Sequence, residues 1–158
     1  MGQRLVADGR DRFLVLTMEG CLISLTRTVS FPATHRMWRS EWSDRENREH
    51  FGPVSDYHGH QYSVSVTVAG PLDPATGMIT DLANLDLVID QEVVSRFSGR
   101  QLNTDLPEFA SGRPLPTCEA LASILYSRIA TRLPSGLGLL RVRVAEDPTL
   151  YAECAGEP

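Results

Sequence analysis

The segment Tyr57–Val68, which reads YHGHQYSVSVTV, constrains the fold of this chain more than any other segment. From Ser63 onward its polar and apolar residues alternate strictly, which is the pattern of a half-buried β-strand. In a strand every second side chain points to the same face. His58 and His60 therefore share the apolar face, at the end where the predicted strand begins.

Two imidazoles on one strand face can bind one metal ion together. A catalytic zinc typically has three protein ligands and a fourth position open to water or substrate. His35 is the candidate third ligand, because it follows Cys21–Phe31, a second segment whose odd-numbered positions are mostly apolar. Antiparallel pairing of the two strands would bring the three histidines together. The alternative is that all three are solvated, and His50 is a further candidate ligand.

The composition narrows the class of function. The net charge is −5 without a basic stripe, so nucleic acids and anionic membranes are poor partners. All 15 basic residues are arginine, which excludes a lysine Schiff base and a Walker-type phosphate loop. The start of the chain is polar, which predicts no signal peptide, and no apolar run is long enough to span a membrane. The cysteines are odd in number and far apart, which indicates a cytoplasmic protein.

Two amphipathic segments predict helices in the second half of the chain. Asp81 and Thr117 can each cap a helix, since apolar residues follow both at helical spacing. The two apolar stripes are Leu85, Ile89, Val93 and Phe97, and then Leu121, Ile124, Leu125 and Ile129.

Alternation predicts two further strands, at 140–146 and 149–154, and Met78–Ile79 is interpreted as a short one. The order of elements indicates an α+β domain with an antiparallel sheet and helices on one face. We expect residues 1–20 to form an N-terminal extension and residues 21–158 to form this single domain.

Glu146 is the one acidic residue on the apolar side of the predicted strand at 140–146. A carboxylate on a buried face needs a partner. It therefore either pairs with an arginine or binds a ligand.

Six short motifs follow one another over roughly residues 22–153. They are Phe31-x-Ala33-x-His35, His58-Gly59-His60-x-Tyr62, Thr76-Gly77-Met78-Ile79-x-Asp81, Leu102-Asn103, Pro116-Thr117-x-Glu119 and Val144-x-Glu146. In order and spacing the set resembles the family of 6-pyruvoyl-tetrahydropterin synthase and 6-carboxy-tetrahydropterin synthase. The resemblance implies the T-fold, a four-stranded antiparallel sheet with two helices on one face. Such subunits assemble as trimers and pairs of trimers, with their sheets joined around a barrel.

The resemblance also implies the chemistry of the site. A zinc ion would polarise hydroxyl and carbonyl oxygens of the substrate and acidify the neighbouring C–H. A late glutamate would accept the N–H donors of a pterin ring. The implied zinc ligands are His35, His58 and His60. The implied ring pocket comprises Thr117, Cys118, Glu119 and Glu146.

Two departures from the family concern acid–base chemistry. The proton-abstracting cysteine of the family stands in the loop before the HxH strand, but residues 53–57 contain no cysteine. The adjacent Asp-His pair of the family corresponds here to Ser98 and Gly99. Asp56 and Tyr57, beside the implied ligands, are the candidate replacements.

A thiol also lies close to the implied ring pocket. Cys118 stands at a predicted helix N-terminus, where the pKa of a thiol would be lowered. The alternative is that it is a small, buried helix residue.

The sequence therefore predicts a zinc-dependent lyase or cyclase of this family with altered chemistry, acting on a pterin or another small heterocycle or carbonyl compound. One alternative is a genuine 6-pyruvoyl- or 6-carboxy-tetrahydropterin synthase acting on dihydroneopterin triphosphate. Another is a pseudoenzyme that binds a pterin-like ligand without turnover. We expect the chain to form a homo-oligomer, a trimer or a hexamer.

Overall fold

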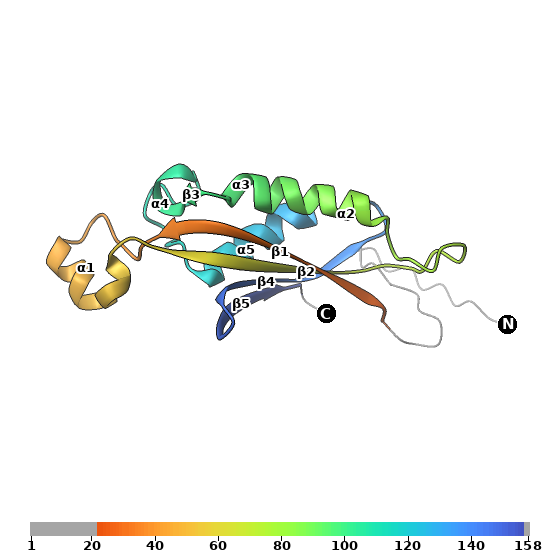
Figure 1. Cartoon of the computed structure of the whole chain (residues 1–158), viewed down its shortest axis with the longest axis horizontal. Coiled ribbons are helices and arrows are strands. Elements are labelled where there is room, and N and C mark those ends of the chain that lie inside the picture. Colours follow the sequence, from red (N-terminus) through yellow and green to blue (C-terminus); the bar gives the residue numbers. More distant parts are fainter. Residues whose placement is uncertain (1–21, 157–158) are drawn as a thin grey trace, which may run out of the picture.

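The computed structural model describes residues 22–156, so the predicted extension at residues 1–20 lies outside the described part of the chain. One five-stranded sheet organises the domain, in the order β3-β1-β2-β4-β5. Its four main strands are antiparallel neighbours, and Figure 1 shows them as one twisted layer. They are β1 (Ser24–His35), β2 (His58–Ala69), β4 (Gly138–Asp147) and β5 (Leu150–Ala155). The predicted α+β class with an antiparallel sheet is confirmed.

The register of β1 against β2 places the histidines. The strands pair along their whole length, from Ser24 opposite Ala69 to His35 opposite His58. Side chains on one face of each strand are buried, whereas their neighbours are mostly exposed or half-buried. His35, His58 and His60 therefore lie on the core side, at the end of the sheet where β1 ends and β2 begins.

Helices cover this core side. The helix after Asp81 runs through α2 (Leu82–Ile89), a π-helical turn (Asp90–Val94) and α3 (Ser95–Phe97), and Figure 1 shows it as one continuous helix. The second is α5 (Cys118–Ala130). Both predicted caps are confirmed, since Asp81 accepts a hydrogen bond from the Ala83 amide and Thr117 from the Ala120 amide.

The π-helical turn explains a stripe with unbroken four-residue spacing. Four residues of an α-helix turn about 400°, so such a stripe drifts by about 40° per step. A π-helical turn takes more residues per turn and cancels part of this drift. As a result, the four side chains of the stripe are fully buried in one core cluster with strand residues such as Phe31, Tyr62 and Val144. These stripe residues are Leu85, Ile89, Val93 and Phe97.

The structure differs from the sequence prediction in three segments. Met78–Ile79 forms no strand, because the turn at Asp73–Gly77 leads directly toward the helix cap. The segment between β1 and β2, for which the sequence predicts no element, contains a short helix, α1 (Asp44–Phe51), with a capping box between Ser43 and Glu46, followed by a 3₁₀ turn (Gly52–Ser55). The segment between the two predicted helices holds β3 (Arg100–Gln101), parallel to β1, and α4 (Leu102–Asp105), neither of which the sequence predicts.

No helix in the described part of the chain is long and apolar enough to cross a membrane.

Candidate metal centre and ring pocket

The three histidines converge at one end of the sheet. The ring centroid of His35 lies 4.5 Å from that of His58 and 5.1 Å from that of His60, and the latter two rings are 5.1 Å apart. One ring nitrogen from each histidine falls in a set whose members lie within 4.8 Å of one another. Pairing of two strands that follow each other in the chain is enough to produce this cluster.

Backbone carbonyls orient two of the rings. Nδ1 of His35 lies 2.7 Å from the carbonyl oxygen of Pro116, and Nδ1 of His58 lies 2.8 Å from that of Asp56. A ring nitrogen that faces a carbonyl must donate, so Nδ1 carries the proton and Nε2 keeps its lone pair. This arrangement is typical of metal-binding histidines, whose second nitrogen is held by an outer partner.

The donors of this cluster fit a metal ion. His35 is fully buried, and its Nε2 and that of His60 have no hydrogen-bond partner among residues 22–156. Burial lowers the pKa of His35 to about 4, with the nearby His58 and His60 acting in the same direction and the Pro116 carbonyl opposing. The ring is therefore neutral at pH 7, as a metal ligand must be. Three imidazole ligands suit zinc and also copper, iron or nickel.

The carboxylate of Glu146 lies beside the histidine cluster, on the side of α5. Glu146 lies on β4 within an irregularity of the ladder between Ala145 and Asp147, and its side chain is 16% exposed. One carboxylate oxygen, Oε2, lies 3.7 Å from Nε2 of His60 and 3.8 Å from Sγ of Cys118. No arginine in the described part of the chain pairs with Glu146, which favours the second of the two alternatives, ligand binding. The carboxylate thus links the histidine cluster to the start of α5.

Two of the other predicted pocket residues differ in their surroundings. Thr117 uses its side chain to cap α5 and is half-buried. Glu119 lies in the first turn of the same helix with an exposed side chain. No hydrogen bond or ion pair within the described region joins Glu119 to the cluster, so its role in the pocket stays a prediction.

Tyr62 is part of the site, although the sequence alone assigns no function to it. Its ring lies 5.5 Å from that of His60 and 5.9 Å from that of His35, measured between centroids. Burial raises the pKa of the phenol above its ordinary value, and the charge of Glu146 and the nearby Cys118 act in the same direction. The HxHxY spacing was the available signal, since it puts the tyrosine on the face of both histidines.

Comparison with known proteins supplies the family. A sequence model described as 6-pyruvoyl tetrahydropterin synthase matches residues 24–157. The chain belongs to this family.

Individual members of the family agree with this assignment. The human 6-pyruvoyl tetrahydrobiopterin synthase is 36% identical over 139 residues, which cover 87% of this chain and 94% of the human one. The Drosophila melanogaster protein of the same name is 35% identical, covering 78% of this chain and 74% of its own. The structure of Caenorhabditis elegans 6-pyruvoyl tetrahydropterin synthase superposes with a TM-score of 0.77 at 28% identity, covering 89% of this chain and all of its own. The recognised family and the T-fold are thus confirmed.

The structure decides between the two interpretations of Cys118, in favour of a small, buried helix residue. Burial, together with the negative charge of Glu146, raises the pKa of this thiol to about 12. The helix N-terminus, which favours a thiolate, is outweighed because desolvation penalises the charged form. Cys118 is therefore a neutral thiol and a weak donor beside Glu146.

We expect Cys118 in the folded protein to resist alkylation by iodoacetamide at pH 8. Only the thiolate reacts, and a pKa of about 12 leaves a thiolate fraction of about 1 in 10,000 at that pH. Mass spectrometry of the peptides would report each cysteine separately, with the half-buried Cys154 as a reference and guanidinium-unfolded protein as the fully labelled control. Rapid labelling of Cys118 in the native state would contradict the raised pKa.

The candidate acid–base residues lie apart from the cluster. The carboxylate of Asp56 is 71% exposed and lies 3.8 Å from Arg48, while its carbonyl orients His58. The Tyr57 ring is exposed and stacks under the guanidinium of Arg36 at 4.4 Å. Within residues 22–156, no hydrogen bond or ion pair joins either side chain to a clustered histidine.

The backbone at Gly99 has a conformation that favours glycine. Gly99 has a φ of +71°, and its amide donates a hydrogen bond to the Pro32 carbonyl as the chain turns from α3 into β3. Side chains other than glycine rarely adopt this conformation. A side chain at position 99 would therefore strain the turn.

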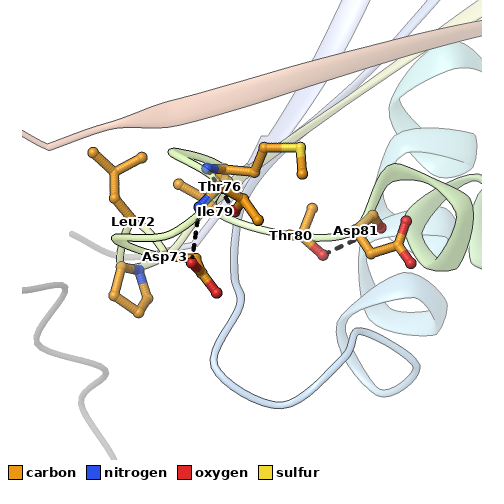
Figure 2. A pocket seen from close by; sticks show the side chains of 8 residues that line it. Leu72, Asp73, Thr76, Ile79, Thr80 and Asp81 are labelled. Atoms are coloured by element: carbon orange, nitrogen blue, oxygen red, sulfur yellow. Dashed lines mark hydrogen bonds between the residues drawn. The ribbon is translucent and has the colours of Figure 1, made fainter.

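A pocket at the opposite end of β2 is formed by its own loop. It has a volume of about 440 Å³ and is lined by residues between Pro71 and Asp81. Figure 2 shows the carboxylate of Asp73 accepting a hydrogen bond from the amide of Thr76. The same carboxylate also accepts from the amide of Ala75. The carboxylates of the pocket thus serve the turn and the helix cap, and the pocket is remote from the histidine cluster.

Proposed function

We propose that this chain is a zinc-dependent lyase or cyclase of the 6-pyruvoyl tetrahydropterin synthase family that acts on a pterin-type substrate with a changed acid–base step. The observation that carries the proposal is the cluster of three oriented histidines beside the buried-side carboxylate of Glu146. In a chain of this family, this arrangement places a metal-binding cluster next to a carboxylate that can bind the substrate ring.

The residues have separate tasks in this proposal. A zinc ion held by His35, His58 and His60 would supply Lewis-acid polarisation of a substrate oxygen. The carbonyls of Pro116 and Asp56 hold two of the imidazoles in their ligating orientation. Glu146 accepts two N–H donors of the ring, and Cys118 and the capped start of α5 form the adjoining wall.

The acid–base step is assigned to Asp56 or Tyr57, as the residues next to the histidine strand. The Asp56 backbone carbonyl accepts a hydrogen bond from His58, so this residue is held directly beside the proposed metal ligand. Tyr57 is held by Arg36, which itself stacks on Trp38 at 3.9 Å. Neutral substitutions, Asp56→Asn and Tyr57→Phe, distinguish the two: the residue that moves the proton loses turnover while ligand binding is kept.

A second candidate function is that of a genuine 6-pyruvoyl- or 6-carboxy-tetrahydropterin synthase. The observation that favours it is the name of the human relative at 36% identity. In this case the same substrate class would be converted to the family's ordinary product, with Asp56 or Tyr57 in place of the cysteine.

The deciding experiment incubates zinc-loaded and metal-stripped protein with dihydroneopterin triphosphate. Chromatography and mass spectrometry follow the pterin products and the released triphosphate. Triphosphate release with a pyruvoyl or carboxy product supports the second candidate, and a different zinc-dependent product supports the first. Equal activity with and without metal would contradict both, and binding without turnover would identify a pseudoenzyme.

We expect Glu146→Gln to weaken the binding of a pterin by about 10- to 100-fold. A hydrogen bond to a charged group contributes about 1.5–3 kcal/mol, and the amide replaces one acceptor oxygen by a donor that faces an N–H of the ring. Fluorescence titration with 6-hydroxymethylpterin would measure the dissociation constant. Glu153→Gln is the matched control, because that carboxylate pairs with Arg143. Unchanged affinity in Glu146→Gln would exclude this residue as the ring anchor.

We also propose that residues 21–158 form one domain and that the active form is a homo-oligomer, a trimer or hexamer. The family assignment supports this assembly. Sedimentation equilibrium would determine the number of subunits.

A further inference from the structure

The hydroxyl of Tyr62 is a buried polar group that the proposed chemistry leaves unused. The side chain is fully buried on β2, and its hydroxyl has no hydrogen-bond partner anywhere in the described part of the chain. A buried hydroxyl without a hydrogen bond has lost its bonds to water and gained none in return, which is unfavourable. The Tyr62 hydroxyl would therefore be stabilised by a ligand that binds here and forms a hydrogen bond with it.

The surroundings of Tyr62 locate the hydroxyl. The ring stacks on Phe31 with centroids 5.3 Å apart and meets the edges of His60 and His35. His60, which the Tyr62 ring meets, also neighbours Glu146, whose Oε2 lies 3.7 Å from Nε2 of His60 and 3.8 Å from Sγ of Cys118. Tyr62 thus belongs to the space between the histidine cluster and the start of α5, where the ring anchor also lies.

We propose that Tyr62 is a further ligand-positioning residue, whose hydroxyl donates a hydrogen bond to the ring oxygen next to the N–H groups that Glu146 binds. This inference rests on the proposed function, since it assumes a ring held by Glu146. In the proposed site, the carboxylate of Glu146 is the hydrogen-bond acceptor and the hydroxyl of Tyr62 is the donor.

The edge of a pterin ring matches this pattern. Its 2-amino group and N3–H are donors, and the adjacent 4-oxo group is an acceptor. Glu146 offers two acceptor oxygens, and the Tyr62 hydroxyl offers one donor beside them. A site built in this way selects a 4-oxo ring, because an analogue without that acceptor leaves the buried hydroxyl unpaired.

A cycle of two ligands and two proteins tests this contact. The ligands are 6-hydroxymethylpterin and its 4-thio analogue, which keeps N3–H but replaces the oxygen by a poor acceptor. The proteins are the wild type and Tyr62→Phe, both metal-loaded, and the readout is the dissociation constant rather than turnover. Phenylalanine preserves the stacking on Phe31, and a thermal melt verifies the fold of the variant.

We expect wild-type protein to prefer the 4-oxo ligand by about 10-fold and Tyr62→Phe to lose most of that preference, because its affinity falls for the oxo ligand alone. Tyr126→Phe is the control, since that hydroxyl donates to the Leu139 carbonyl and its loss should leave both affinities unchanged. Equal weakening of both ligands in Tyr62→Phe would overturn the ring contact in favour of an indirect effect through Glu146. Failure of wild-type protein to bind either ligand would overturn the proposed function itself, and this inference with it.

Discussion

Replacing His58 by alanine is expected to abolish tight metal binding and to reduce the metal-dependent activity by more than 100-fold. His58 is one of three imidazoles whose nitrogens lie within 4.8 Å of one another, so its loss leaves two ligands on the core side of the sheet. Loss of an outer hydrogen-bonding partner alone costs about 10–100-fold in metal affinity or activity, and loss of a ligand should cost more. Metal content after dialysis, measured by plasma mass spectrometry, would fall from about one ion per chain toward zero.

The sequence offers a matched control for this substitution. His50, the remaining histidine of the chain, is exposed on α1 and packs on the Trp42 ring at 4.6 Å between centroids. His50→Ala should therefore keep both the metal and the activity. Retention of a full equivalent of metal by His58→Ala, or its loss in His50→Ala, would place the metal elsewhere. Circular dichroism separates loss of metal from loss of fold.

The sheet and its histidines were predictable because their signals are local. Alternation identifies β1 and β2 without knowledge of the fold, and these strands follow each other in the chain. Once they pair as antiparallel neighbours, the register of His35 opposite His58 follows from the two apolar faces. The caps at Asp81 and Thr117 depend on contacts within three residues and were equally readable.

The features that escaped prediction depend on contacts between distant segments. Pro116 orients His35 across 81 positions of sequence, and nothing in the spacing of either residue indicates that contact. β3 pairs with β1 through two residues, too few to show a period. The sequence left open whether Cys118 is an acidic thiol at a helix start or a small, buried helix residue. Its burial beside Glu146, which comes 28 residues later, decides for the buried thiol.

A buried carboxylate outside the site gives the second large effect, on stability. Glu92 lies in the π-helical turn with its side chain 4% exposed, and its oxygens lie 2.8 Å from Arg128 and 3.2 Å from Arg132 on and just after α5. These ion pairs connect the helix that runs from α2 to α3 with α5, and α5 begins at the ring pocket. Replacing both arginines, in the double variant Arg128→Met and Arg132→Met, leaves the buried Glu92 carboxylate without an ion-pair partner.

We expect this double variant to lose about 3–5 kcal/mol of unfolding free energy, the usual cost of an uncompensated buried charge. Adding Glu92→Met should restore most of the loss, because no charge then remains to be solvated. Urea unfolding followed by circular dichroism would measure all three proteins. Arg45→Met is the control: its pair with Glu49 is 86% and 59% exposed, and exposed pairs contribute about 0–1 kcal/mol. If the triple variant were no more stable than the double one, the loss would come from the arginine side chains covering the core, and the charge of Glu92 would not be its cause.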